Sequence, residues 1–295
     1  MFRGTYTALV TPFSNDRIDE SSLGRLIEFQ IENGITGIVP VGTTGESPTL
    51  DHAEHTRVIE FAVLEAKGRC KVIAGTGSNS TSEAVTLTRD AENVGADAAL
   101  LVAPYYNKPS QEGLYRHFKT IADASNLPLI LYSIPARCGI EIGVETVVRL
   151  VESCPNVVAI KEAGGSVERV NMLRSALVPE KFDILSGDDS LTLPFMAAGA
   201  TGVISVASNL IPGEVGQMVR HFLNDDIVTA RDLHYRYYPL FKDLFIEPNP
   251  VPIKTALAWA GKITTSDVRL PLCEMSEANA KKLRLTLANL GLLPS

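Results

Sequence analysis

Eight short hydrophobic runs recur along the first two thirds of the chain, and stretches with helical spacing separate them. The runs are continuously apolar rather than alternating, which is typical of strands that are covered on both faces. They cover residues 7–13, 37–42, 71–77, 98–104, 127–135, 157–163, 182–187 and 202–208. A doubly wound sheet would also accommodate such strands. Strand and helix alternating eight times, at intervals near thirty residues and with polar residues after many runs, favour a closed (β/α)8 TIM barrel.

The segments between the runs carry apolar residues three and four positions apart. In residues 21–34 this spacing extends from Leu23 to Ile31, and Gly34 is well placed to end the helix. The alternation of strand and helix is architectural only, because the sequence contains no short-period repeat.

The pattern changes after about residue 225, where helical stretches follow one another without strand-like runs between them. These stretches cover residues 225–245, 250–261 and 276–291, and proline-rich connections separate them. We therefore expect an α/β chain with two domains, a catalytic barrel over residues 1–225 and a small C-terminal helical domain over residues 226–295.

Composition narrows the class of protein. The chain has 295 residues, 45% of them hydrophobic and 21% charged, with a net charge of −7, as in an ordinary globular protein. It has no basic stripe, so nucleic acid is not an expected partner. No apolar stretch approaches the roughly 18 residues that a membrane-spanning helix needs, and the N-terminus lacks signal-peptide features. We expect a cytoplasmic protein without a membrane partner.

The four cysteines are far apart and form no CxxC pair. They are Cys70, Cys138, Cys154 and Cys273. This spacing indicates neither a disulfide framework nor a zinc site, so we expect reduced, buried thiols.

Lys161 lies at the end of the sixth run. Burying an ammonium group there costs desolvation free energy, so a functional role would explain its presence. Strand alternation places Val157, Ala159, Lys161 and Ala163 on one face, and the alanines would leave room around the amine. A desolvated amine is neutral more often at pH 7 and can form a Schiff base with a keto group. On this stretch alone, a lysine that reaches solvent or pairs with a carboxylate is an equally good interpretation.

Other polar residues follow the predicted strands. The loop GTTGES, residues 42–47, combines glycines with hydroxyl groups and suits a small carboxylate, although it is a weak signal by itself. GTGSNS, residues 75–80, lacks the third glycine of a dinucleotide-binding loop. Tyr132 could pack in the barrel or relay protons, and Arg137 could bind a carboxylate or form a surface ion pair.

Three further clusters remain ambiguous. His52 and His55 share a helix face, but no further metal ligands are evident nearby, so we do not expect a metal site. Ser80 and Glu83 fit a capping box. Asp188 and Asp189 could be a supporting pair near the site or a helix cap.

Six separated motifs, in order, resemble the dihydrodipicolinate synthase (4-hydroxy-tetrahydrodipicolinate synthase) family. They are GTTGES, APYYNKPSQEGLYRHF, YSIPARCG, IKEAGG, SGDDSLTLPFMAAGATGVISVASN and EPNPVPIK. The resemblance extends from about Gly4 to the C-terminus. It implies a (β/α)8 barrel with a C-terminal helical domain. The implied enzyme is a lyase that condenses pyruvate with L-aspartate 4-semialdehyde in the diaminopimelate route to lysine.

The resemblance also implies roles for individual residues. Lys161 matches the lysine that forms an imine with pyruvate, and no cofactor or metal is implied. Tyr132 matches the tyrosine that moves protons, and Thr43 and Tyr106 match the residues that link it to solvent. In the family the equivalent of Tyr106 enters a neighbouring subunit, so we expect a homo-oligomer, usually a tetramer built as a dimer of dimers.

Substrate contacts are implied in the same way. Thr44 matches a contact to the pyruvate carboxylate, and Arg137 matches the arginine that receives the carboxylate of the semialdehyde. Gly187 and Ile204 match backbone positions near the pocket. Two residues depart from the family pattern: Ser133 stands where asparagine is common and Cys138 where threonine is common, which puts the hydrogen bonding around Arg137 in doubt.

Many bacterial members of the family are inhibited by lysine bound at the dimer interface. The matching positions are Ser47, Pro48, His52, His55, Asn79, Glu83 and Tyr105. Because this polar set is complete, we expect inhibition by L-lysine.

Two alternatives remain. N-acetylneuraminate lyase and the 2-keto-3-deoxy sugar acid aldolases share the lysine, the tyrosine and a GxTGE loop, but Arg137 in PxRxG and GTTGE in place of GSTGE favour the synthase. A noncatalytic ligand-binding barrel would have lost the imine machinery, which this chain retains.

Overall fold

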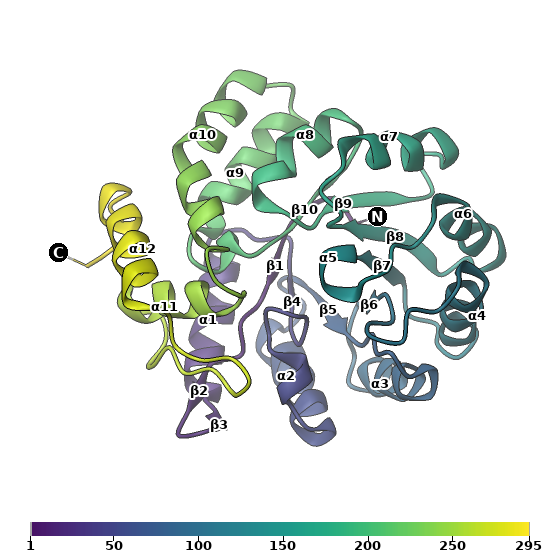
Figure 1. The fold of residues 1–295 in the computed structure, drawn as a ribbon, viewed down its shortest axis with the longest axis horizontal. Coiled ribbons are helices and arrows are strands. Elements are labelled where there is room, and N and C mark those ends of the chain that lie inside the picture. The colour runs from purple at the N-terminus through teal and green to yellow at the C-terminus, as the bar shows by residue number, and fades with distance from the viewer. Residues whose placement is uncertain (1, 295) are drawn as a thin grey trace.

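The computed structural model describes residues 2–294 and places eight parallel strands in a closed barrel (Figure 1). The strands are β1 (Gly4–Ala8), β4 (Gly37–Val39), β5 (Lys71–Gly75), β6 (Ala98–Val102), β7 (Leu129–Ser133), β8 (Val157–Glu162), β9 (Asp183–Ser186) and β10 (Gly202–Ser205). Each pairs with the next, and β10 pairs with β1 to close the barrel. The predicted (β/α)8 barrel is confirmed.

Seven of these strands lie inside the runs expected from the sequence, and the first does not. The expected run covered residues 7–13, whereas β1 is Gly4–Ala8. Leu9 and Val10 are buried without belonging to a strand, and the chain then forms a small hairpin of β2 (Phe13–Ser14) and β3 (Arg17–Ile18). Burial of irregular chain after the strand therefore extended the apolar run past its end.

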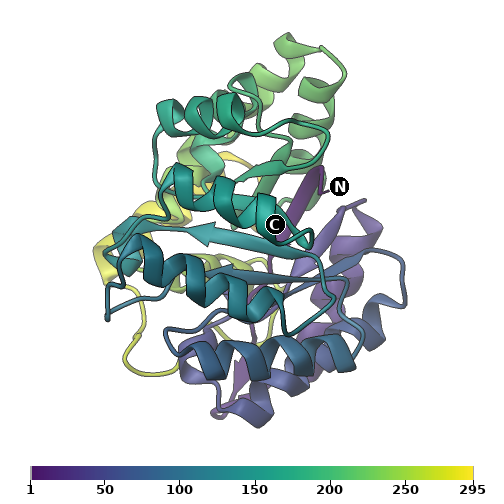
Figure 2. The ribbon, with the colours of Figure 1, turned by 90° about the vertical axis from the view of Figure 1, so that its right-hand side faces the viewer.

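Helices cover the outside of the barrel, as Figure 2 shows from the side. They are α1 (Glu20–Glu32), α2 (His52–Ala66), α3 (Thr81–Asn93), α4 (Gln111–Ala122), α6 (Val144–Ser153), α7 (Val167–Ala176), α8 (Thr192–Ala197) and α9 (Pro212–Leu223). A further short helix, α5 (Pro135–Cys138), lies in the loop that follows β7. Several begin at a side-chain cap that accepts a backbone N–H, for example Asp19 for α1 and Asp51 for α2. Gly34 follows α1 with φ +70°, as the expected helix end requires.

The three helices expected after residue 225 are present as α10 (Ile227–Asp243), α11 (Val251–Trp259) and α12 (Glu277–Asn289). They lie at one side of the barrel (Figure 1), where α12 packs against α10 and α11. Leu283 and Leu287 of α12 are fully buried and belong to the same hydrophobic cluster as the barrel residues. The boundary between two domains at residue 225 stays a prediction.

One expectation about the cysteines is wrong. Cys70, Cys138 and Cys154 are buried as expected, but Cys273 is exposed because it lies in the connection between α11 and α12.

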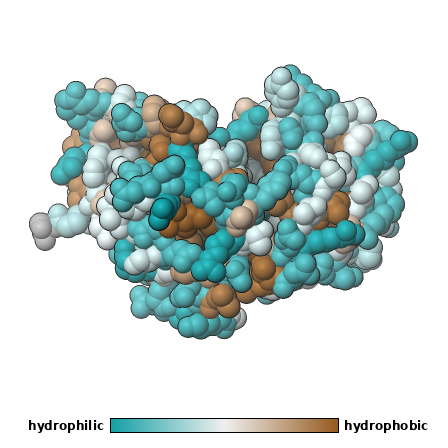
Figure 3. Space-filling model, turned by 90° about the horizontal axis from the view of Figure 1, so that it is seen from below, coloured by the Kyte–Doolittle hydropathy of each residue, from teal (hydrophilic) through white to brown (hydrophobic). Residues whose placement is uncertain are grey.

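One face of the molecule is mostly hydrophilic with separate hydrophobic groups (Figure 3). Over residues 2–294, no helix combines the length and the apolar character that crossing a membrane would need.

Candidate active site

Lys161 lies in β8 near the carboxyl end of the strand, the end at which the loops of such barrels form active sites. Its side chain is buried, and burial lowers the pKa of its amine from 10.5 to about 8. The Asp189 carboxylate opposes this shift, and the Arg137 guanidinium adds to it. Such an amine is neutral in about one molecule in ten at pH 7. The next residue, Glu162, pairs instead with Arg169 of α7 at 2.7 Å, as strand alternation predicts.

Tyr132 lies beside Lys161, because β7 and β8 are in register at these two residues. The Lys161 Nζ is 4.3 Å from the centre of the tyrosine ring. Burial raises the pKa of the Tyr132 hydroxyl to about 12, while the Arg137 charge and a hydrogen bond with Thr43 act in the opposite direction. The phenol is therefore protonated at neutral pH and has a hydroxyl partner.

A small cavity of about 30 Å³ adjoins Tyr132. Thr43, Ser47 and Tyr132 are among the residues that line it. A polar cavity of this size can hold a water molecule. The cavity thus provides room for a water next to the Tyr132 and Thr43 hydroxyls, where a proton relay requires one.

Thr44 lies in the tight loop between β4 and α2. Its buried hydroxyl oxygen accepts a hydrogen bond of 2.9 Å from the Asn249 side-chain amide. The Glu46 N–H donates to the Thr43 carbonyl at 3.1 Å, and the Gly45 N–H donates to the Gly42 carbonyl at 3.0 Å. The loop closes on itself and presents both threonines in a fixed arrangement.

Arg137 lies in the short helix α5, directly after β7, and its side chain is exposed. Its Nη2 donates to the Asn249 carbonyl at 3.3 Å. Asn249 therefore contacts both Thr44 and Arg137, although the two follow different strands, β4 and β7. Asn249 stands in the EPNPVPIK motif, but its role could not be read from the sequence.

Gly187 follows β9 and leaves space above the lysine. A Cβ at this position would lie 3.1 Å from Lys161 Cε and 2.7 Å from Ala163 Cβ. Ile204, the other expected pocket position, is buried in β10. Ser133, which follows Tyr132 in β7, is buried too, and its hydroxyl accepts a hydrogen bond of 3.4 Å from the Ile142 N–H.

The two aspartates after Gly187 have different surroundings. Asp188 accepts from the Ser190 N–H at 2.8 Å and so caps a short helical turn. Asp189 is buried, and its carboxylate accepts from the N–H groups of Val206 and Ala207 at 3.0 and 2.9 Å. Burial raises the pKa of Asp189 to about 6, although hydrogen bonds from Ser205 and these N–H groups lower it. The sequence left this pair ambiguous.

Tyr106 is placed differently from the other expected catalytic residues. Its side chain is 90% exposed, and its backbone has φ +72°. A left-handed backbone is uncommon for a residue other than glycine and occurs where the surroundings hold it. Within one chain the ring projects into solvent.

A second pocket of about 140 Å³ lies beside the first. Six of the seven residues expected to bind an effector line it: Ser47, Pro48, His52, His55, Glu83 and Tyr105. The seventh, Asn79, is adjacent and donates to the Tyr105 carbonyl at 3.2 Å. Ser47 and Gly77 also line the small cavity beside Tyr132, so these two residues border both spaces.

Hydrogen bonds organise the acidic end of this pocket. Glu83 accepts from the Ser78 hydroxyl and pairs with His52 Nε2 at 2.7 Å, and these bonds lower the pKa of Glu83. His55 is buried against the Gly75 carbonyl at 2.9 Å, and burial lowers its pKa. The expected capping box is only half formed: the Ser80 hydroxyl accepts from the Glu83 N–H, but the Glu83 carboxylate turns to Ser78 and His52 instead.

No group of three His, Cys, Asp or Glu side chains in residues 2–294 is gathered to hold a metal ion. The ionisable groups instead meet at the carboxyl ends of the strands, the arrangement of a (β/α)8-barrel enzyme.

The chain belongs to the dihydrodipicolinate synthetase family, whose model matches residues 1–290. A relative from Sulfurihydrogenibium sp. (strain YO3AOP1), called 4-hydroxy-tetrahydrodipicolinate synthase, is 54% identical over 293 residues, which are 99% of this chain and 100% of the relative.

Two solved structures show the same fold. One is the family enzyme from Cyanidioschyzon merolae with lysine bound, which is 42% identical with a TM-score of 0.96 and covers 99% of each chain. The other is the chloride-inhibited dihydrodipicolinate synthase from Acinetobacter baumannii complexed with pyruvate. It is 45% identical with a TM-score of 0.96, over 99% of this chain and 100% of that one.

Proposed function

We propose that this chain is a 4-hydroxy-tetrahydrodipicolinate synthase that condenses pyruvate with L-aspartate 4-semialdehyde through a Schiff base on Lys161. The observation that carries the proposal is the buried Lys161 amine, with its pKa lowered to about 8, next to the Tyr132 hydroxyl. The family to which the chain belongs and the pyruvate complex of its Acinetobacter baumannii relative also support it. No cofactor beyond the imine is part of the proposal.

The chemistry follows from the two pKa values. Neutral Lys161 attacks the keto carbon of pyruvate, and protonated Tyr132 donates its proton to the oxygen that leaves as water. Loss of a methyl proton from the imine gives an enamine, whose carbon attacks the aldehyde. The amino group of the second substrate then displaces Lys161 and closes the ring, which frees the enzyme amine.

The carboxylates of the two substrates would be held on different loops. The hydroxyl of Thr44 and the N–H groups of its loop suit the pyruvate carboxylate. Arg137, being exposed at the mouth, suits the carboxylate of the semialdehyde. Gly187 and Ile204 would border the bound substrate through their backbone.

The exposed ring of Tyr106 supports an oligomeric site. We assign it to the catalytic pocket of a second subunit, where it would join the relay formed by Tyr132 and Thr43. Other large hydrophobic side chains also reach the surface, including Val228, Tyr235 and Leu270. The proposed assembly is a tetramer made of two such dimers, and the proposed location is the cytoplasm.

Reduction with borohydride in the presence of pyruvate tests the mechanism. Peptide mass analysis should find the reduced adduct on Lys161, and the trapped protein should be inactive. Folded protein without an adduct would refute the imine. Supplying pyruvate with either aspartate semialdehyde or N-acetylmannosamine then separates the synthase from the lyase, since only the semialdehyde should be consumed.

We further propose that L-lysine inhibits the enzyme from the second pocket. Glu83 and the two histidines offer acceptors for ammonium groups, and a lysine-bound relative supports the assignment. Glu83→Gln should raise the half-inhibitory L-lysine concentration about tenfold, the typical effect of losing a charged hydrogen bond. The uninhibited rate should change little. Equal inhibition of wild type and Glu83→Gln would remove Glu83 from the effector site.

A further inference from the structure

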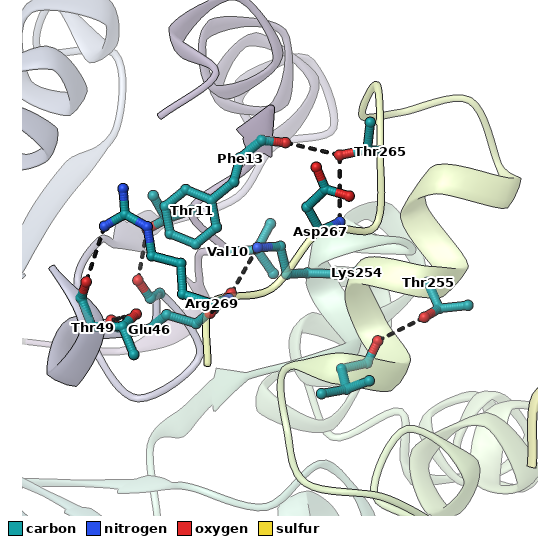
Figure 4. Close-up of polar contacts among 12 residues, drawn as sticks. Val10, Thr11, Phe13, Glu46, Thr49, Lys254, Thr255, Thr265, Asp267 and Arg269 are labelled. Carbon is teal, nitrogen blue, oxygen red and sulfur yellow. Dashed lines mark hydrogen bonds and ion pairs between the residues drawn. The ribbon is translucent and has the colours of Figure 1, made fainter. Parts of the chain in front are cut away.

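Glu46 and Lys254 form an ion pair that is fully buried (Figure 4). The Lys254 Nζ lies 2.6 Å from Glu46 Oε1. Glu46 belongs to the GTTGES loop after β4, and Lys254 belongs to the first turn of α11. The pair therefore joins the loop that carries Thr43 and Thr44 to the C-terminal helices.

The surroundings fix both partners. The second carboxylate oxygen of Glu46 accepts a 3.0 Å bond from the Arg269 N–H. The Phe13 ring lies between the two cations, 4.2 Å from Lys254 Nζ and 4.5 Å from Arg269 Cζ. Arg269 also donates to the Thr49 carbonyl at 2.9 Å, two residues beyond the end of the loop. Figure 4 shows the Lys254 amine meeting the Glu46 carboxylate and the Arg269 guanidinium reaching Thr49 nearby.

Stability alone does not account for a buried ion pair at this position. Desolvation of two charges usually cancels their attraction, and apolar residues of similar size often stabilise a core as well or better. The adjoining residues Ile253, Ala256 and Leu257 of α11 show that this helix otherwise packs with apolar side chains. A buried ion pair also fixes the relative positions of the two segments that carry its partners, here the GTTGES loop and α11.

The backbone of the loop shows what is held. Val41 and Glu46 both have left-handed backbones, with φ +49° and φ +56°. This conformation is unfavourable for residues other than glycine, and most of all for a β-branched one, and it persists where neighbouring contacts fix it. Glu46 is fixed by its side chain to Lys254 and by its N–H to the Thr43 carbonyl at 3.1 Å.

We propose that Glu46 and Lys254 are positioning residues that hold the GTTGES loop in the shape that binds the pyruvate carboxylate. The inference rests on the proposed function, because that function gives Thr44 its substrate. Both side chains are fully buried, so the pair acts through the backbone of the loop. Arg137 lies on a different loop, after β7, and its bond to Asn249 goes to the backbone carbonyl, so its binding of the second substrate should depend on the pair much less than pyruvate binding does.

The test is the double variant Glu46→Gln/Lys254→Met, which removes both charges and leaves no unpaired one behind. Its matched control is Thr255→Val, on the same helix, where the hydroxyl bonds to the Val251 carbonyl of the same helix at 2.9 Å. Borohydride trapping at graded pyruvate concentrations gives the half-saturating concentration, which should rise about tenfold in the double variant. The KM for the semialdehyde should stay within about twofold, and the control should match wild type in both.

A second readout does not depend on activity. Hydrogen exchange of peptides covering residues 41–49 should be faster in the double variant than in wild type and Thr255→Val. If the double variant does not fold, Glu46→Asp replaces it, because it keeps both charges and shortens the side chain that holds the loop; half-saturating pyruvate should then rise about threefold.

The outcomes separate the two proposals. A wild type that forms no adduct on Lys161 refutes the proposed function, and loop exchange then still decides whether the pair positions the loop. Unchanged exchange overturns the positioning role, and so does an unchanged half-saturating pyruvate concentration in an enzyme that forms the adduct. A parallel rise in both substrate constants also overturns it, since that result indicates general damage.

Discussion

Two lysines of this chain are buried, and their surroundings give them opposite properties. Lys161 at the barrel mouth has no ion-pair partner in the part of the chain that the structure describes, and burial lowers its pKa to about 8. Lys254 touches the Glu46 carboxylate at 2.6 Å. Burial lowers the Lys254 pKa as well, but the charge and hydrogen bond of Glu46 oppose that change.

The comparison shows that burial by itself does not make a lysine reactive. A buried amine is neutral more often when no carboxylate is bonded directly to it, and it stays a fixed cation when one is. The hydrophobic run before Lys161 indicated burial, but whether a carboxylate lies within bonding distance of the amine is a property of the folded site. Substitutions at each lysine and at its neighbours should therefore have different effects.

The largest effect should follow from Lys161→Arg, which keeps a cation and removes the nucleophile. The condensation rate should fall by roughly 10⁴-fold or more, as when other covalent catalysts lose their nucleophile. Assay of the purified variant, with circular dichroism to show that it is folded, provides the measurement. An adduct with pyruvate on another residue of this variant would show that Lys161 is not the residue whose surroundings make it reactive.

Lys254→Met should act on stability instead. It leaves the Glu46 carboxylate buried without its partner, which typically costs about 3–5 kcal/mol. Urea unfolding would measure the loss, and adding Glu46→Gln should restore most of it. A stability loss below about 1 kcal/mol would mean that water reaches Glu46 and that the pair is not truly buried.

The pH dependence of imine formation should distinguish Lys161 from an ordinary lysine. Its folded-state pKa lies below the usual 10.5, so the amine is neutral above about pH 8. The rate of pyruvate imine formation should therefore rise about tenfold per pH unit up to pH 8 and then level off. Rapid quenching at each pH, followed by mass analysis, measures it. A rise that continues to pH 10 would show an unperturbed amine.

The smallest effect should come from Asp189→Asn. The Asp189 carboxylate raises the pKa of Lys161, so its removal should move the break in the pH profile to lower pH. Imine formation at pH 7 would then be faster, by about threefold. A break that moves upward instead would show that Asp189 does not act on the Lys161 amine through its charge.

The fold could be predicted well because buried parallel strands are apolar on both faces, which the sequence displays directly. The error at β1 has the same cause: Leu9 and Val10 are as buried as a strand, so the pattern does not reveal that pairing has ended. Hydrophobicity reports burial, and strand ends are set by hydrogen bonding.

The site was predictable only where a residue stands at a strand end. Lys161 and Tyr132 do, and the structure places them side by side. Asn249 reaches Thr44 from 205 residues away, and no local spacing indicates such a contact. Glu83 shows the same limit, because the sequence offered it a local helix cap while the fold supplied His52 and Ser78.

The distance along the chain between Glu46 and Lys254 has a consequence for how the protein is made. The two are 208 residues apart, so at about 5–20 residues per second the ribosome adds Lys254 roughly 10 to 40 s after Glu46. During that interval the loop that carries Thr43 and Thr44 exists without its anchor. On the positioning role proposed above, the loop is among the first parts of the site to be synthesised but takes its final shape only after Lys254 has been added.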